Sequence, residues 1–121
     1  MVAALRAAEA AAGEPVCYVI SGDLAHIGPK FDDPDLVDGP WLKRSRQRDT
    51  ELTRRAEAAD SSGFFRLIAD EGDARRICGL PPAWTVLEAA KPSKGRLLHY
   101  DQYAHPQGFE SVSFAAMAFE A

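Results

Sequence analysis

The chain has 121 residues, and we expect residues 1–121 to form a single domain. Its 14 basic and 18 acidic residues give a net charge of −4, which argues against a protein whose whole surface binds nucleic acid. No run of about 18 apolar residues is present to span a bilayer. Two cysteines are too few for a disulfide scaffold, so we expect a cytoplasmic protein with free thiols.

The first forty residues predict a helix, a strand and a long loop. The alanine-rich range 2–12 consists of good helix formers, and Gly13 is a natural stop. The apolar run Val16–Ile20 is typical of a strand covered on both faces, as in a parallel sheet, and this places Cys17 in the core. The range 23–40 combines Gly and Pro with an acidic cluster, which predicts a loop.

Helical patterns dominate the middle of the chain. The range 41–59 predicts a helix, and the alternating charges along residues 41–60, six basic and four acidic, indicate a solvated face rather than a nucleic-acid site. Asp60 could cap a second helix that turns Phe64, Leu67 and Ile68 to one face and ends at Gly72.

Two prolines, Pro81 and Pro82, fit the first turn of a third helix. Its apolar residues follow helical spacing and predict a stripe facing the core, made of Ala83, Val86, Leu87 and Ala90. Strands are predicted over 96–103 and 111–119, and the second should be central because both of its faces are apolar. The fold class is therefore α/β, a helix-flanked mixed sheet with about three strands and three to four helices.

The segment Ser21–His26 is the first candidate site, because open α/β sheets bind ligands at the ends of buried strands. His26 could exchange a proton near neutral pH or, when neutral, bind a metal ion. Asp23 could orient the ring or accept backbone hydrogen bonds in the turn. The alternative is that Asp23 caps a turn and His26 is a partly exposed loop residue, since one Asp-x-x-His spacing is a weak signal.

Cys78 is the second candidate. It precedes a helix that starts with proline, and Arg75 and Arg76 lie close by in the sequence. A helix N-terminus and neighbouring cations favour the thiolate, which is the form that binds metals or acts as a nucleophile. The alternative is an inert buried cysteine, the usual fate of a free thiol.

Two motifs stand out together in the sequence. Val16–Asp33 reads VCYVISGDLAHIGPKFDD, a predicted strand followed by Ser-x-Asp-x-x-His and x-Gly-x-x-Phe, and Arg76–Gly79 followed by Pro81 contains Cys-Gly. Both motifs resemble those of the Memo-like family, of the type found as protein B of the AmmeMemoRadiSam system. The ranges 97–101 and 112–116 resemble its closing strands, so the resemblance covers nearly the whole chain.

This resemblance implies a fold similar to the extradiol ring-cleaving dioxygenases, which hold non-haem iron with two histidines and a glutamate and use a further histidine as acid/base. His26 matches that acid/base histidine. Cys78 matches the position where Memo proteins carry a thiol in place of the glutamate, which moves the metal preference towards copper or zinc. We therefore name His26 and Asp23 as catalytic candidates and Cys78 and His26 as metal ligands.

The sequence departs from the family in one respect. The two histidines of the family's N-terminal half, in His-Ala-Gly-like and Ser-His-like motifs, are absent, so the chain corresponds to the C-terminal half. We accordingly expect no bound divalent or copper ion in the isolated chain, and either a homo-oligomer or a partner that supplies the missing half. The competing hypotheses are a non-catalytic protein- or ligand-binding module that uses the former cleft, and a truncated product with no role of its own.

Overall fold

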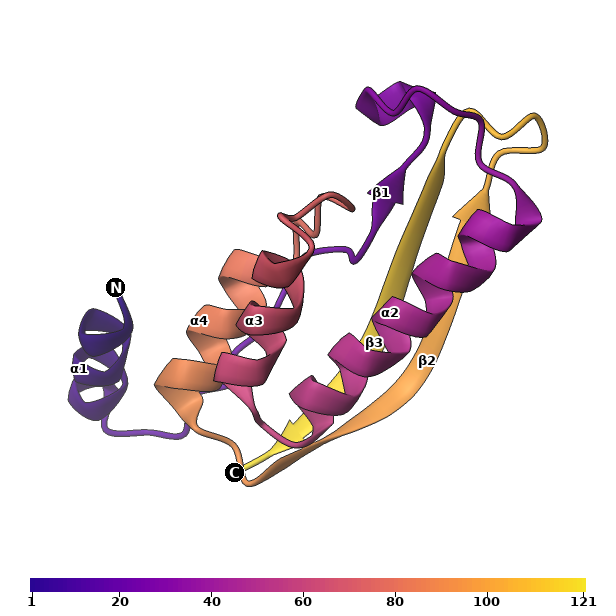
Figure 1. Cartoon of the computed structure of the whole chain (residues 1–121). Helices are drawn as coiled ribbons and strands as arrows, with labels where there is room; N and C mark the ends of the chain where they lie inside the picture. Colours follow the sequence, from indigo (N-terminus) through magenta and orange to yellow (C-terminus); the bar gives the residue numbers. More distant parts are fainter.

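The computed structural model describes all residues 1–121 (Figure 1). Its helices and strands, in chain order, are α1 (Val2–Ala12), β1 (His26–Ile27), the 3₁₀ helix η1 (Pro29–Phe31), α2 (Gly39–Glu57), α3 (Ser61–Asp70), α4 (Leu80–Ala90), β2 (Lys94–Ala104) and β3 (Ser111–Glu120). The predicted α/β class is confirmed. None of the helices has the length and apolar composition needed to cross a bilayer.

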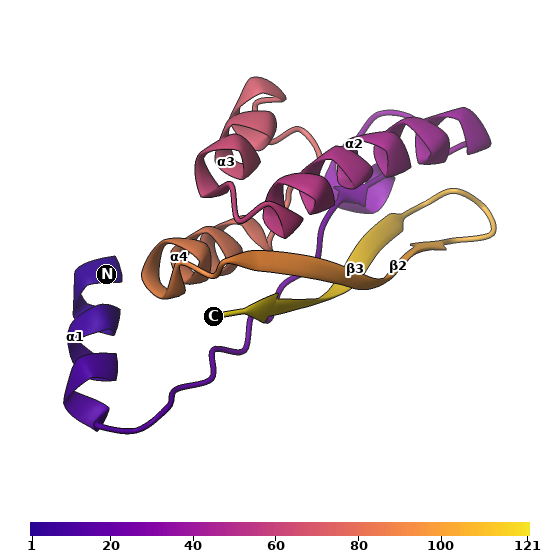
Figure 2. The same ribbon diagram turned by 90° about the horizontal axis from the view of Figure 1, so that it is seen from below.

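The sheet has three strands in the order β1-β3-β2, and both pairings are antiparallel. The prediction that the last strand is central is therefore confirmed. Helix α2 lies along one face of the β2–β3 hairpin, as Figure 2 shows from below. The side chains of Met117 and Phe119 pack on that side against the core that α2 and α3 form, whereas Leu98 and Phe114 remain exposed.

Local sequence signals set the helix boundaries. The Asp38 carboxylate accepts a hydrogen bond from the Trp41 N–H at 2.7 Å and starts α2, and Asp60 caps α3 through the Gly63 N–H at 2.8 Å, as predicted. In α4 the predicted stripe is only partly buried. Leu87 lies in the core, but Ala90 is exposed, because α4 borders an open cavity on this side.

The predicted strand over Val16–Ile20 is wrong. The segment from Val16 to Gly22 has no strand structure, and none of its backbone groups forms a hydrogen bond with another backbone group. Cys17 is exposed rather than buried in the core. The physical reason is pairing: β-branched residues favour a strand only where a neighbouring strand accepts them, and this stretch has no neighbour.

The long loop predicted over 23–40 is wrong in part, because it contains β1 and η1. Pairing with β3 begins as the chain reaches Leu24, whose N–H donates to the Ser113 carbonyl at 2.8 Å. Ser113 also accepts a hydrogen bond from the Ala25 N–H through its side-chain oxygen, at 2.9 Å. Long-range pairing therefore placed a strand where composition indicated only a turn.

A buried polar network joins α2 to the sheet and to the turn after α3. Asp49, which is 0% exposed, accepts hydrogen bonds from Arg75, from the Tyr100 hydroxyl at 2.7 Å and from the Ser113 hydroxyl at 2.6 Å. Glu71 holds the other side of the Arg75 guanidinium. This corrects the prediction that the charges of the α2 range form a solvated face: Asp49 points inward because a buried arginine requires a carboxylate partner.

Burial raises the pKa of Tyr100 above its ordinary value of 10.0, and the hydrogen bond to the Asp49 carboxylate raises it further. The phenol ionises near pH 10 in the unfolded chain and only at higher pH in the folded one, so folding stability should fall as pH rises above about 10. Free energies of unfolding measured between pH 8 and pH 11 test this. Tyr100→Phe should flatten the alkaline fall, whereas Tyr103→Phe, at an exposed position, should leave it intact.

Candidate metal centre

Two glycines bring the separate motifs together. A Cβ atom on Gly22 would lie 2.7 Å from the Cα atom of Gly79, and a Cβ atom on Gly79 would lie 2.7 Å from the carbonyl oxygen of Asp23. No side chain fits in that space, so the two backbones touch. The Gly79 N–H donates to the Asp23 carbonyl at 2.8 Å and fixes the contact. The turn before α4 is thereby held against the end of the Ser21–His26 motif.

This contact places the sulfur of Cys78 directly against Asp23. The Asp23 N–H donates to Sγ at 3.1 Å, and the Asp23 carbonyl oxygen lies 3.6 Å from the same sulfur. The thiol is exposed, so the alternative of an inert buried cysteine does not describe Cys78.

His26 projects from β1 towards the same point, and its ring is held by backbone carbonyls. Nδ1 lies 3.2 Å from the Leu24 oxygen and 3.1 Å from the Arg76 oxygen. Carbonyl oxygens only accept hydrogen bonds, so these partners assign the proton to Nδ1 and leave the lone pair on Nε2. Phe31 packs its ring against the imidazole, with the centroids 5.2 Å apart and the planes at 89°.

The Nε2 atom faces Asp23 at 3.8 Å from the carboxylate oxygen Oδ2, too far for a hydrogen bond. The geometry does not support the expectation that Asp23 orients the ring, because the carbonyls of Leu24 and Arg76 hold it instead. The Asp23 side chain is 51% exposed and the His26 side chain 18% exposed. The half-exposed Asp23 carboxylate therefore lies next to the largely buried imidazole of His26.

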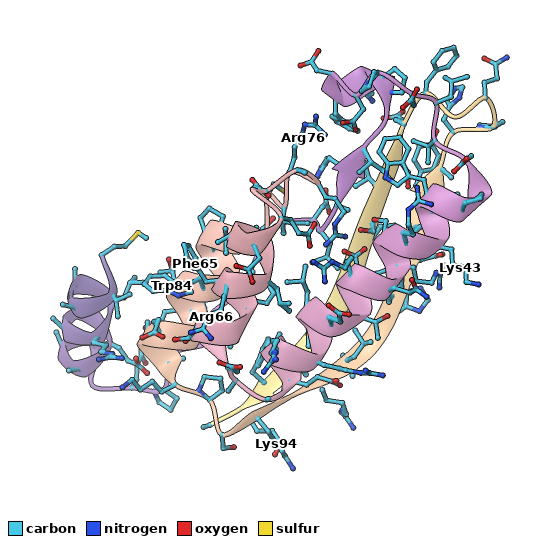
Figure 3. All side chains as sticks on the ribbon, viewed as in Figure 1. Lys43, Phe65, Arg66, Arg76, Trp84 and Lys94 are labelled. Carbon is cyan, nitrogen blue, oxygen red and sulfur yellow. The ribbon has the colours of Figure 1, made fainter.

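An ion pair between Arg76 and Asp33 also holds the two motifs together. The Arg76 guanidinium binds both carboxylate oxygens of Asp33, at 3.0 and 3.1 Å, and also donates to the His26 carbonyl at 3.3 Å. The same Asp33 carboxylate accepts the Gly28 N–H at 2.8 Å. Figure 3 shows Arg76 reaching from the turn before α4 towards β1. Arg76 thus connects the turn before α4 with the His26 carbonyl and the Asp33 carboxylate.

The structure brings all three candidate residues together. Nε2 or Nδ1 of His26, a carboxylate oxygen of Asp23 and Sγ of Cys78 lie within 4.8 Å of one another. Bond lengths to zinc are about 2.0 Å for nitrogen and oxygen and about 2.3 Å for sulfur, so donors at tetrahedral angles on one ion lie roughly 3.3–3.5 Å apart. The three donors must therefore move closer together before they can share one ion, and the side chains of Asp23 and Cys78 are exposed. The set of one nitrogen, one sulfur and one oxygen fits a zinc- or copper-type ion.

Sequence reasoning missed the residues that assemble this site. Gly22 and Gly79 stand directly beside the named donors, and a glycine next to a donor in each of two motifs is the signal that could have suggested a close backbone approach. The pair of Arg76 and Asp33 gave no such signal, because the two residues are far apart in the sequence and each is common on protein surfaces.

The fold and the donor cluster define an α/β protein with a potential metal site where its first strand meets the turn before α4. The sequence model of the family described as Memo-like protein matches residues 2–118. The chain therefore belongs to the Memo-like family, as the motifs indicated. It is similar to a MEMO1 family protein of Aquifex aeolicus (strain VF5), with 30% identity over 104 residues, which cover 84% of this chain and 26% of the relative. The chain thus spans about a quarter of that relative's length.

Proposed function

We propose that the chain serves as a metal-binding, redox-related component in the cytoplasm, with Cys78 and His26 as the metal ligands and Asp23 as a third donor. One observation carries the proposal: sulfur, nitrogen and oxygen donors from two distant motifs lie within 4.8 Å of one another. The lone pair of the imidazole is on the nitrogen that faces this cluster, because Nδ1 already donates to carbonyl oxygens.

The chemistry of the donors favours copper or zinc over iron. A thiolate is a soft ligand, and an imidazole suits the same two metals. A bound ion of this kind would supply Lewis-acid or redox chemistry. The chain's own residues would hold it, and when His26 is not a ligand its Nε2 lone pair can instead accept a proton from a substrate, with Asp23 nearest to it.

Catalytic metal sites usually hold three protein ligands and keep a further position open. Cys78, His26 and the half-exposed Asp23 reach that number only if the carboxylate binds. We therefore propose that a firm site forms in an assembly, in which a second copy of the chain or a separate polypeptide supplies a further donor. In this respect the proposal follows the expectation from the sequence.

Cobalt(II) titration of the purified protein tests the metal site. With Co²⁺ in excess, which fills even the weak site of the isolated chain, a Co²⁺–thiolate absorption band should appear with the wild-type protein and disappear with Cys78→Ser. His26→Gln should weaken binding by at least about 10-fold, which is the smallest loss usual for residues that support a metal site.

The matched control is Cys17→Ser, because Cys17 is the other free, exposed thiol of the chain and lies outside the donor cluster. This variant should bind Co²⁺ as the wild type does. An absorption band that survives in Cys78→Ser, or one that is lost in Cys17→Ser, would contradict the assignment.

A second candidate function is a non-catalytic module that binds an apolar ligand. A cavity of about 650 Å³ with mostly apolar walls lies beside the site, and Gly22 and Gly79 belong to both. This volume falls within the range of about 300–1,000 Å³ that is usual for small-molecule sites. Binding of an apolar ligand that is unchanged in Cys78→Ser would favour this function over the metal site.

A further inference from the structure

Arg75 and Arg76 stand just before Cys78 in the sequence, and carboxylates balance the charge of both guanidinium groups. The Arg75 side chain is only 8% exposed and is paired with two carboxylates, and the Arg76 side chain is paired with a third. Little positive charge is therefore left to stabilise a thiolate at Cys78, which was the reason for noting the two arginines in the sequence. Their backbone contacts are with His26 instead.

The two arginines hold His26 through consecutive backbone carbonyls. The His26 N–H donates to the Arg75 carbonyl at 2.7 Å, and the His26 Nδ1 atom lies 3.1 Å from the Arg76 carbonyl oxygen. The first contact fixes the backbone of His26. The second fixes its ring and places the ring proton on Nδ1, so that Nε2 keeps the lone pair that a metal ion requires.

The Arg76 carbonyl reaches the ring from a backbone conformation that is unfavourable by itself. Arg76 has a φ of 52°, in the left-handed region that residues other than glycine rarely adopt. The preceding turn supports it, because the Asp73 carbonyl accepts the Arg76 N–H at 2.9 Å and the Asp73 side chain accepts the Ile77 N–H at 2.9 Å. Such a conformation persists only where its surroundings enforce it.

The Arg75 side chain anchors this turn inside the protein. Its Nε and Nη2 atoms donate to the Glu71 carboxylate at 2.7 and 3.0 Å. Its Nη1 atom donates to the Asp49 carboxylate and to the carbonyl oxygen of Ser45 at 3.2 Å, both in α2. A guanidinium presents its donors in one rigid plane, so partners on both sides determine where the Arg75 backbone lies.

We propose that Arg75 is a positioning residue of the candidate metal centre. Its buried guanidinium fixes the turn whose carbonyls impose the Nδ1–H form of His26 and direct Nε2 towards the donor cluster. This role rests on the proposed function only where it concerns the metal ion, since the tautomer of His26 can be measured without one. The role is geometric, so it depends on the planar shape of the guanidinium and not on its charge alone.

Nitrogen-15 NMR of the histidine rings tests the proposal on the metal-free protein in EDTA. Correlations between ring protons and ring nitrogens show which nitrogen carries the proton, at about pH 9, where an imidazole is ordinarily neutral. His26→Gln identifies the His26 signals by removing them. The His26 proton should be on Nδ1. His105 is the internal reference, because its Nδ1 accepts the Gln107 N–H at 3.1 Å and its proton is therefore on Nε2.

Arg75→Lys keeps the positive charge but cannot bind both carboxylates in one plane. The preference of His26 for the Nδ1–H form should be lost, and the affinity for Co²⁺ should fall by at least about 10-fold. Glu71→Gln keeps the shape of the partner side chain and weakens its hold on the guanidinium. It should shift the tautomer in the same direction, and it remains informative if Arg75→Lys does not fold.

Tyr100→Phe is the matched control. It removes a hydrogen bond to Asp49 but leaves both carboxylate partners of Arg75 in place. This variant should be less stable than the wild type and still keep the Nδ1–H form of His26. Urea unfolding of each variant confirms that the NMR signals come from folded protein.

Three results would overturn the proposal. The first is a wild-type His26 ring with its proton on Nε2. The second is an unchanged tautomer in every Arg75→Lys or Glu71→Gln protein that folds, which is also what a role of Arg75 through charge alone predicts for Arg75→Lys. The third is a loss of the Nδ1–H form in Tyr100→Phe as well, because the effect would then follow stability in general. The Co²⁺ band of Cys78→Ser is a separate result: if that band persists while the tautomers behave as expected, the metal site is wrong and the positioning role of Arg75 stands.

Discussion

Asp49→Ala should lower the free energy of unfolding by about 3–5 kcal/mol, the usual result of removing one partner from a buried ion pair. The variant loses the carboxylate that faces Arg75, and the hydroxyl groups of Tyr100 and Ser113 lose their acceptor. The free energy of unfolding of a native domain is only about 5–15 kcal/mol. The variant should therefore unfold at a urea concentration well below the midpoint of the wild-type protein. Urea unfolding followed by circular dichroism measures the change.

An exposed ion pair on the same helix provides the control. In α2, Nη1 of Arg48 lies 2.9 Å from Oε2 of Glu51, and both side chains are exposed. Glu51→Ala should therefore change the free energy of unfolding by no more than about 0.5 kcal/mol. If Asp49→Ala proves equally mild, the buried network does not join α2 to the sheet in the way the contacts indicate.

The second large effect concerns the close approach of the two motifs. Gly22→Ala puts a methyl group 2.7 Å from the Cα atom of Gly79, and because backbone meets backbone, no flexible side chain can move aside. The turn before α4 must shift away from Asp23, which removes the hydrogen bond from the Asp23 N–H to the Cys78 sulfur. We expect the affinity for Co²⁺ to fall by at least about 10-fold.

Gly79→Ala should produce the same loss, since its methyl group would meet the Asp23 carbonyl oxygen at 2.7 Å. The control is Gly39→Ala at the start of α2, where a Cβ atom meets nothing within 4 Å and the backbone is not left-handed. That variant should bind Co²⁺ as the wild type does. Urea unfolding of all three variants separates loss of the site from loss of the fold, and a Gly22→Ala protein with full Co²⁺ affinity would show that the contact does not build the site.

Local signals predicted the helices and the hairpin well. The cap at Asp60, the paired prolines at the start of α4 and the apolar pattern of β3 act through neighbours within a few residues, so the sequence shows them directly. The prediction of a strand over Val16–Ile20 failed because it depends on contacts outside the segment. Its composition favours a strand, but a strand exists only with a partner, and the chain brings none to it.

The donor residues of the candidate site were predictable from the sequence, but the contacts that hold them in place were not. His26 and Cys78 were named from their chemistry, and the structure places them together, although their roles stay predictions. The clamp of Arg76 and Asp33 and the buried Asp49 were not predicted, because each depends on contacts between elements that are remote in the sequence. A charged residue in a charged helix gives no local sign that it faces inward.

The shortness of β1 also bears on how the protein reaches its native state. His26 and Ile27 pair with Val112 and Ser111, so this ladder of two residues closes a loop that contains most of the chain. The β2–β3 hairpin and the helices form from contacts close in sequence, and closing a long loop for so few hydrogen bonds is entropically unfavourable. The His26 imidazole should accordingly reach its native position last during folding. The amide protons around it should exchange with solvent before those of the hairpin.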